Sequence, residues 1–478
     1  MLFNSLSFAL FLPIVFSLYW FVMNKTLKLQ NLLLLCSSYF FYACWDWRFL
    51  FLLLFSTSLD YFTGIKIATS TSKSLKRFWF WLSIVVNLGC LGVFKYYDFF
   101  AISFAETIKS FGFHVDIWTL RVILPVGISF YTFHGLSYII DIYQGRIKPE
   151  KNFINYSLFV SFFPLLVAGP IERATHLLPQ IQKKRTFNYS EAVDGLRQIL
   201  WGLVKKIIIA DSCARVANTI FNSYEDHSGS TLVLGAIFFS IQIYCDFSGY
   251  SDIALGTARL FGIRLIKNFS FPYFSRDIAE FWRRWHISLS TWFRDYLYIP
   301  LGGSKGPIWK KIRNTFIIFT VSGFWHGSNW TFIIWGVLNA LYIVPSILFK
   351  TNRNNLDVVA SGRQFPSLKE FLSISLTFAL ITFSWIFFRS KNLSSAVDYI
   401  SKIFSRTLFS VPSIRPLDLF SMIILFIGIE WIGRRDNYAI ETFALNYSKP
   451  LRWSFYALLT IAILYHSGSD EQFIYFQF

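Results

Sequence analysis

Residues 281–306 read FWRRWHISLSTWFRDYLYIPLGGSKG and lie between long apolar runs of the chain. Charged and titratable side chains occur here among many aromatic ones: Arg283, Arg284, His286, Arg294 and Asp295. Such groups are costly inside a bilayer, and the segment is also too apolar for a loop in water. We therefore predict either an interfacial amphipathic helix or a cationic lining for an anionic substrate.

The composition of the whole chain is that of a membrane protein. Of its 478 residues, 54% are hydrophobic, 20% aromatic and 15% charged, whereas soluble domains have about 25% charged residues. Phe and Trp, present 56 and 17 times, suit lipid-facing surfaces and membrane interfaces. The expected fold class is an all-α polytopic membrane protein.

The net charge of +18 comes from short basic clusters between apolar runs. This distribution indicates cytoplasmic loops under the positive-inside rule and argues against nucleic acid as a partner. Five cysteines show no CxxC or ligand spacing, which favours small core residues over disulfides or a metal site. The apolar N-terminus lacks the features of a signal peptide and is expected to be a retained first span.

Apolar runs approach the length of a membrane span, about 20 residues, many times along the chain. Spans are expected near residues 3–22, 30–44, 49–65, 78–96, 120–142, 198–221, 231–262, 313–326, 329–349, 369–389, 417–433 and 449–466. CWDWR at 44–48 should turn a hairpin. YSLFVSFFPLLVAGPI at 156–171 contains two prolines and should form a re-entrant segment covered by protein or water. An amphipathic surface helix is expected within 389–406.

The basic loops also predict an orientation and a domain organisation. Loops at 23–29, 66–77, 145–154, 183–185 and 305–313 should face the cytoplasm, and the acidic loop 222–230 should lie outside with the N-terminus. We expect a single integral membrane domain, 1–478, with a motif-bearing core at about 120–350 and C-terminal helices within 369–466. Membrane lipids are therefore expected partners.

A histidine in VSGFWHGSNWTFIIWG, residues 321–336, is the leading catalytic candidate. His326 lies deep in an apolar segment, with small or hydrogen-bonding neighbours at Gly323, Gly327, Ser328 and Asn329. A neutral imidazole at this depth can act as a general base toward a hydroxyl nucleophile. The alternative is a core histidine with a structural hydrogen bond.

Two further segments carry polar residues within apolar runs. Asp246 and Asp252 in IYCDFSGYSDIALG, residues 243–256, predict a break in a helix, either as a polar kink or as support for a site histidine. Residues 124–145, with His134, predict a broken span along a cavity. His134 ranks below His326 because it lacks neighbouring hydrogen-bond donors. Motifs of self-contained hydrolases, motor ATPases and zinc proteases do not occur.

The quoted motifs resemble the membrane-bound O-acyltransferase (MBOAT) family. FWRRWHISLSTWFRDYLYIPLGG followed by FWHGSNWTFIIWG is most similar to the alginate O-acetyltransferase branch of bacterial polysaccharide O-acetylation proteins. YCDFSGYSDIALG, NFSFPYFSRDIAEFWRRWHISLS and LVAGPIER also resemble that branch. The similarity covers roughly residues 1–350, and the rest of the chain is similar only in hydropathy.

The resemblance implies a fold, a reaction and partners. The fold is a ring of about 11–13 transmembrane helices around a thin core with re-entrant and interfacial helices. His326 is the catalytic histidine, and His286 is the second family residue, toward the cytoplasmic entrance. The donor is acetyl-CoA, with no bound cofactor. The acetyl group crosses the bacterial inner membrane to a periplasmic SGNH-type acetyltransferase or directly to a polysaccharide.

Charge and resemblance together predict roles for the other candidates. Phosphates of the donor would meet Arg283 and Arg284 first, since guanidinium groups suit phosphate oxygens. Asn329, Ser328 or backbone N–H groups are candidates for stabilising the oxyanion. Arg294, Asp295 and Asp246 are further candidate binding residues.

Other functions stay open on the sequence. They are D-alanyl or other acyl transfer by the same fold, transport of a polysaccharide or lipid-linked sugar, and a subunit that only anchors a periplasmic enzyme. The sequence also leaves open the acceptor polysaccharide, the oligomeric state and a covalent acyl-enzyme.

Overall fold

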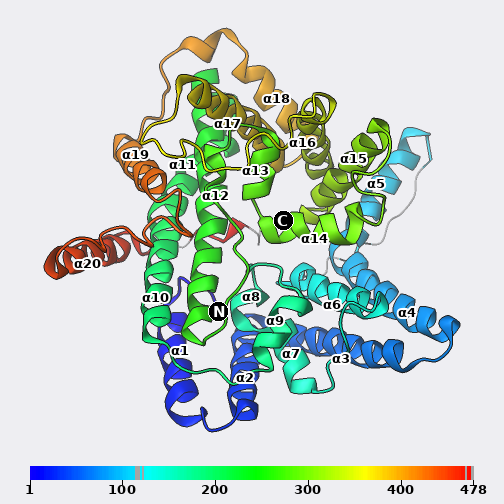
Figure 1. Cartoon of the computed structure of the whole chain (residues 1–478). Helices are drawn as coiled ribbons and strands as arrows, with labels where there is room; N and C mark the ends of the chain where they lie inside the picture. The colour runs from blue at the N-terminus through cyan, green and yellow to red at the C-terminus, as the bar shows by residue number, and fades with distance from the viewer. Residues whose placement is uncertain (114–118, 121–122, 469–470, 475–478) are drawn as a thin grey trace. The chain divides into compact units, whose positions relative to one another are not determined.

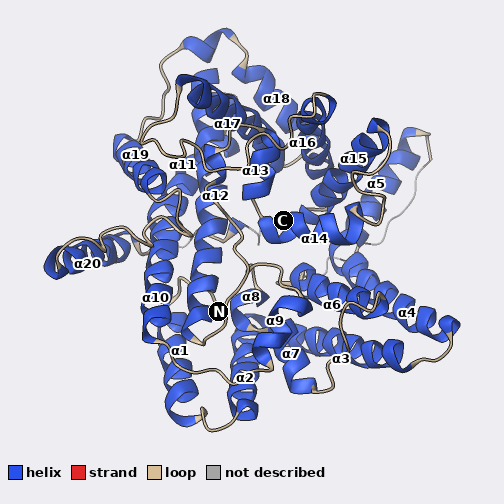
Figure 2. Ribbon diagram, viewed as in Figure 1, coloured by secondary structure: helices blue, strands red, loops and turns tan. Residues whose placement is uncertain are grey.

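The computed structural model describes residues 1–113, 119–120, 123–468 and 471–474. Within these ranges every regular element is helical and no strand occurs (Figure 2). Five helices in this part of the chain are long and apolar enough to cross a membrane: Arg48–Thr69, Lys73–Ser110, Gly229–Leu260, Trp330–Leu348 and Leu368–Arg389. The predicted all-α polytopic class is confirmed. The other expected spans are shorter or more polar helices, and their number in the bilayer stays a prediction.

The described residues form two compact units, of which the first comprises Met1–Ala192 and Thr257–Ile266. Its helices are α1 Leu6–Ser17, α2 Leu27–Asp46, α3 Arg48–Thr69, α4 Lys73–Leu91, α5 Tyr97–Ser110, α6 Ile128–Tyr143, α7 Phe153–Ser161, α8 Phe163–Leu166 and α9 Ala174–Ile181 (Figure 1). Short π-helical segments extend α1 and join α4 to α5. The sequence predicted a single domain, residues 1–478. The division into two compact units does not test whether they form one domain, so this stays a prediction.

The turns of the first unit follow its sequence signals. The expected hairpin at 44–48 is present, because α2 ends at Asp46 and α3 begins at Arg48. The stretch 156–171 is broken at Phe162, between α7 and α8, and all of it is buried. Protein therefore covers this irregular backbone, as membrane proteins require. In the stretch 124–145, Gly127 has φ of +75° and precedes α6, which is unbroken from Ile128 to Tyr143. The expected broken span along a cavity stays a prediction.

The second unit comprises Val193–Gly256 and Lys267–Phe478. It contains α11 Asp211–Asn222, α13 Ile278–Arg284, α14 Ile287–Phe293, α15 Ile308–His326, α16 Trp330–Leu348, α17 Leu368–Arg389, α18 Leu393–Ile403, α19 Leu417–Ile432 and α20 Lys449–His466, with most of α10 Tyr189–Leu203 and α12 Gly229–Leu260. A π-helical segment, Val204–Ala210, joins α10 to α11. The expected amphipathic surface helix is α18, which buries one stripe of residues, Ala396, Tyr399 and Ile403.

The predicted break at 243–256 is wrong, because α12 runs without interruption from Gly229 to Leu260. Its aspartates do not require a kink, since both meet buried lysines of the π-helical segment. Asp252 pairs with Lys205 at 2.6 Å and Asp246 with Lys206 at 2.9 Å. A Cβ on Gly249 would lie 2.7 Å from the carbonyl oxygen of Gly202, so the glycines here permit close helix packing.

Helices α15 and α16 form a close antiparallel pair around two glycines. A Cβ on Gly323 would lie 2.2 Å from the carbonyl oxygen of Phe332, and a Cβ on Gly336 would lie 2.2 Å from that of Phe319. Real Cβ atoms do not approach backbone this closely, so glycine is required at both positions. This contact fixes the end of α15, where His326 lies.

Candidate active site

His286 lies in a sharp bend between two helices of seven residues each, α13 and α14. Its φ of +44° is in the left-handed region, which non-glycine residues adopt only where the surroundings hold them. Two backbone hydrogen bonds of 2.9 Å tie the bend to the segment before α13, from Ser270 N–H to Arg284 O and from Ile287 N–H to Asn268 O. His286 therefore does not continue the helix of Arg283.

The imidazole of His286 is buried and held from several sides. Its Nδ1 lies 3.1 Å from Oδ1 of Asn268. Its ring lies 4.6 Å from that of Phe247 on α12, centroid to centroid, and 1% of the residue is exposed. Burial lowers the pKa of His286 to about 3, because a charged imidazolium would lose its hydration. The ring is therefore neutral at physiological pH.

His326 is the last residue of α15 and is packed among aromatic rings. The ring centroids of Trp325, Trp335 and Phe388 lie 4.8, 5.2 and 5.3 Å from that of the imidazole. The ring centroid of His286 lies 6.4 Å away. The structure thus brings the two predicted histidines together from segments 40 positions apart in sequence.

Both histidines line one cavity of about 300 Å³. Its other walls include Arg283 and Arg294 from the quoted segment, and Ser322 of α15. The indole ring of Trp282 also lines it, and the buried Nε1–H of this ring has no hydrogen-bond acceptor among the described residues. The cavity therefore offers two imidazoles, two guanidinium groups and a buried N–H donor.

A larger, basic cavity of about 680 Å³ adjoins the first and shares Arg283 and Tyr298 with it. Its walls carry three further cationic side chains, Lys311, Lys350 and Arg353. They come from α15 and from the loop between α16 and α17. Four positive charges around one cavity are suited to a group with several negative charges, such as a diphosphate.

Arg284 has a different environment from its neighbour. Its Nη2 lies 2.8 Å from the carboxylate of Glu280, which is 1% exposed and also pairs with Arg276 at 3.1 Å. Arg276 in turn pairs with Asp357 at 2.9 Å, and its guanidinium lowers the pKa of that carboxyl. Arg284 thus belongs to an ion-pair cluster that anchors the loop after α16, and the cavity walls do not include it.

The remaining predicted site residues lie at or beyond the edge of the cavity. Asp295 pairs with Arg294 at 2.7 Å. Asn329 caps α16 by accepting a hydrogen bond from Thr331 N–H, and its Nδ2 donates to Lys391 O at 2.8 Å. Neither Asn329 nor Ser328 is in the cavity wall. Asp246 belongs to the lysine network of α12.

Several residues of the site were missed by sequence reasoning. Asn268 meets His286, Trp282 supplies a free donor, and Lys311, Lys350 and Arg353 surround the basic cavity. Asn268 and Trp282 lie inside quoted motifs but have types that are common in structural roles. In the sequence the three basic residues have the pattern of loop charges, and only the fold places them around one cavity. Among the described residues no group of three His, Cys, Asp or Glu is arranged to hold a metal ion.

Comparisons with known proteins identify relatives of this chain. Residues 150–387 match the model of the MBOAT, membrane-bound O-acyltransferase family. A probable alginate O-acetylase, AlgI, of Pseudomonas aeruginosa is 39% identical over 92% of this chain and 82% of its own length. A peptidoglycan O-acetyltransferase of Helicobacter pylori is 34% identical over 100% of this chain and 98% of its own. A teichoic acid D-alanyltransferase of Bacillus subtilis is 29% identical over 56% of this chain and 69% of its own.

Proposed function

Because the chain belongs to the membrane-bound O-acyltransferase family, we propose that it transfers an acetyl group from cytoplasmic acetyl-CoA to an acceptor across the bacterial inner membrane. The acceptor is a hydroxyl of a cell-surface polysaccharide, or a periplasmic SGNH-type acetyltransferase that passes the group on. The observation that carries this proposal is the pair of buried imidazoles, 6.4 Å apart by ring centroids, in a cavity beside a basic one.

The basic cavity supports a donor with several phosphates. In the proposal, Arg283, Lys311, Lys350 and Arg353 bind the phosphate groups of coenzyme A. The pantetheine arm is uncharged and flexible, and it extends past Arg283 into the cavity of the histidines. Arg283 lines both cavities and thus marks the passage between them.

The chemistry follows from the groups around the second cavity. His326 takes the proton of the acceptor hydroxyl while the hydroxyl oxygen attacks the carbonyl carbon of the thioester. The new C–O bond forms and the C–S bond breaks. Coenzyme A then leaves as a thiol, with the proton returned by the imidazolium. The Nε1–H of Trp282 donates a hydrogen bond to the carbonyl oxygen as negative charge develops on it.

The acceptor is proposed from the relatives. An alginate O-acetylase and a peptidoglycan O-acetyltransferase both match this chain over at least 92% of its length, whereas the teichoic acid D-alanyltransferases match it over 55–56%. The coverage favours acetyl transfer to a glycan over D-alanyl transfer. Membership of an acyltransferase family also decides against the transporter alternative.

The test is acetyl transfer by the purified full-length protein in lipid vesicles. With radiolabelled acetyl-CoA and an oligosaccharide acceptor, His326→Ala should remove at least about 99% of the transfer, since a positioned base contributes roughly 10²–10⁴-fold. A matched control is His227→Ala, because His227 lies in a loop of the same unit and contacts Ser223. Unchanged transfer by His326→Ala would refute the proposal. Transfer of D-alanine from a pantetheinylated carrier in its place would favour the alternative.

A further inference from the structure

Asn268 contacts His286 through a set of buried hydrogen bonds. Its Oδ1 lies 3.1 Å from Nδ1 of His286, and it accepts from the backbone N–H and the hydroxyl of Ser288 at 3.3 and 2.9 Å. Its Nδ2 donates to the hydroxyl oxygen of Ser251 at 3.2 Å. None of these four residues is more than 3% exposed. The arrangement is therefore shielded from exchange with bulk water.

These contacts determine which imidazole nitrogen of His286 carries the proton. A backbone N–H can only donate, so the Asn268 atom that faces Ser288 N must be the oxygen. The same oxygen faces Nδ1 of His286, and Nδ1 must then be the donor in that contact. In a neutral imidazole only one nitrogen is protonated, so Nε2 is unprotonated and is a hydrogen-bond acceptor.

We propose that Asn268 is a positioning residue that holds His286 in its Nδ1–H form, so that Nε2 accepts a hydrogen bond from an N–H or O–H group of the bound substrate. The identity of that substrate rests on the proposed function, but the tautomer does not. An accepting Nε2 suits an amide N–H of a pantetheine arm or a sugar hydroxyl. It also rules out His286 as a donor to the thioester oxygen, which is left to Trp282.

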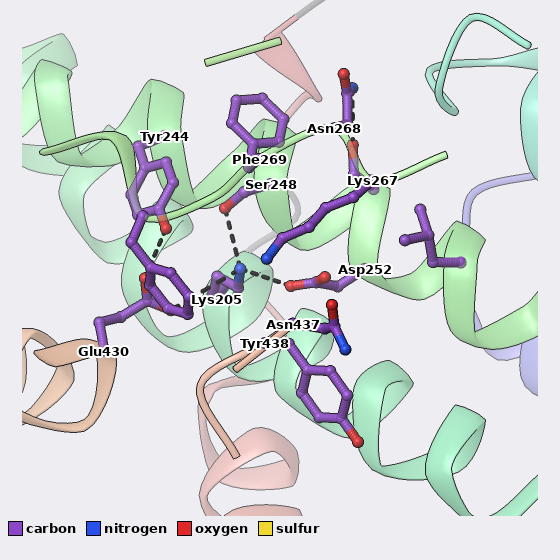
Figure 3. Close-up of a pocket in the computed structure, with 13 residues that line it drawn as sticks. Lys205, Tyr244, Ser248, Asp252, Lys267, Asn268, Phe269, Glu430, Asn437 and Tyr438 are labelled. Carbon is purple, nitrogen blue, oxygen red and sulfur yellow. Dashed lines mark hydrogen bonds and ion pairs between the residues drawn. The ribbon is translucent and has the colours of Figure 1, made fainter. Parts of the chain in front are cut away.

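A small polar pocket beside Asn268 helps to fix the orientation of the Asn268 side chain. The pocket has a volume of about 10 Å³, room for about one water molecule, and Asn268 and Ser251 lie in its wall. At its centre Lys205 pairs with Asp252, and Lys267 reaches in from the residue next to Asn268 (Figure 3). Lys205 and Asp252 thus form an ion pair inside the pocket, and this polar network restricts the orientation of the Asn268 side chain.

The neutral state of His286 agrees with the proposed tautomer. Burial lowers its pKa to about 3, so the ring has one proton, not two, at pH 7. The titratable group whose ring meets it is His326, at 6.4 Å between centroids. The charged groups Lys205, Asp252, Lys267 and Glu430 line the small polar pocket that also has Asn268 in its wall. Arg283 and Arg294 line the cavity of the two histidines.

The direct test is solid-state NMR of the full-length protein in lipid bilayers, with ¹⁵N-labelled histidine. The signals of His286 are identified by their absence in His286→Gln. We expect a protonated Nδ1 and an unprotonated Nε2 between pH 6 and pH 8. A protonated Nε2 together with an unprotonated Nδ1 would overturn the proposal, and this result does not depend on whether the protein transfers acetyl groups.

Variants at Asn268 give a second, functional test. Asn268→Ala should lower acetyl transfer by about tenfold to a hundredfold, as loss of an orienting partner commonly does. Asn268→Asp keeps the accepting oxygen but adds a negative charge, which raises the pKa of His286. Protonation then blocks Nε2 at a higher pH, so the acid limb of the pH–rate profile should move to higher pH.

The matched control is Asn314→Asp, which introduces the same charge at a buried asparagine of the same unit whose Oδ1 already accepts from Arg313. Asn314→Asp should not shift the acid limb of the pH–rate profile. If Asn268→Asp lowered the rate equally at every pH, Asn268 would be structural only and the proposal would fail. If the tautomer were as expected and no variant or wild-type protein transferred acetyl groups, the proposed function alone would fail.

Discussion

At the scale of single residues, the neighbours Arg283 and Arg284 have different tasks. Arg283 lines both cavities, and its guanidinium donates to the backbone carbonyls of Asn352 and Asn355 at 2.8 and 2.7 Å. Arg284 pairs with the buried Glu280 in the ion-pair cluster with Arg276 and Asp357. Both lie in one short helix, yet Arg283 lines the two cavities and Arg284 pairs with a neighbouring side chain.

This difference predicts separable defects. Arg283→Gln should raise the KM for acetyl-CoA by about tenfold or more, because a charge-assisted hydrogen bond contributes roughly 1.5–3 kcal/mol. Arg284→Gln should lower the free energy of unfolding by about 2 kcal/mol, since Glu280 would lose one of its charged partners. Steady-state kinetics and thermal unfolding in detergent measure the two effects. The prediction fails if both variants change the same quantity by the same amount.

At the scale of elements, the contact between α15 and α16 fixes the position of His326. Gly323 lies one helical turn before His326 and faces the backbone of Phe332. Any side chain there must push the two helices apart by roughly the size of a methyl group. The imidazole would then shift relative to His286.

Gly323→Ala is therefore expected to lower both stability and activity. Overpacking of this kind costs about 1–3 kcal/mol, and a small displacement of a catalytic group lowers the rate by roughly a hundredfold. Gly428→Ala in α19 is the matched control, because a Cβ there would have no atom within 4 Å. Thermal unfolding and acetyl transfer of both variants check the prediction, and equal behaviour of the two would contradict it.

Sequence patterns predicted the local elements well where the signal is local. The hairpin at 44–48, the irregular and protein-covered backbone within 156–171 and the amphipathic helix α18 all follow from charges, prolines and apolar spacing within one segment. The break at 243–256 was predicted wrongly because Lys205 and Lys206, which neutralise its aspartates, lie about 40 residues earlier. For the same reason Asn268 and the basic residues of the larger cavity were missed, since their partners in the site lie far away in the sequence.

At the scale of the whole molecule, the charge pattern predicts an orientation in the membrane and, with it, the side from which the proposed acetyl donor enters. The basic loop 305–313 is expected in the cytoplasm and the acidic loop 222–230 outside. Lys305 and Asp226 are both exposed residues of the second unit, one in each of these loops. A donor that enters beside Lys311 comes from the side of the first loop.

Single cysteines at these positions test the orientation. In a variant with its five native cysteines replaced by serine or alanine, Lys305→Cys and Asp226→Cys should react with a membrane-impermeant maleimide from opposite sides of the inner membrane. Asp226→Cys should react in intact spheroplasts and Lys305→Cys after the membrane is opened. Reaction of Lys305→Cys in intact spheroplasts would place the basic cavity outside and contradict a cytoplasmic donor.

The ion-pair cluster around Glu280 affects how the turnover number of the enzyme depends on the thickness of the bilayer. Arg276, Glu280, Arg284 and Asp357 all lie outside the five helices that are long and apolar enough to cross a membrane. Such helices tilt when acyl chains become shorter or longer, and Arg276 also pairs at 3.8 Å with Glu370 in the first turn of one of them, α17. We expect the turnover number to change with bilayer thickness, because a tilt of α17 moves one partner of the cluster that anchors the loop after α16, and this loop carries Lys350 and Arg353 of the basic cavity.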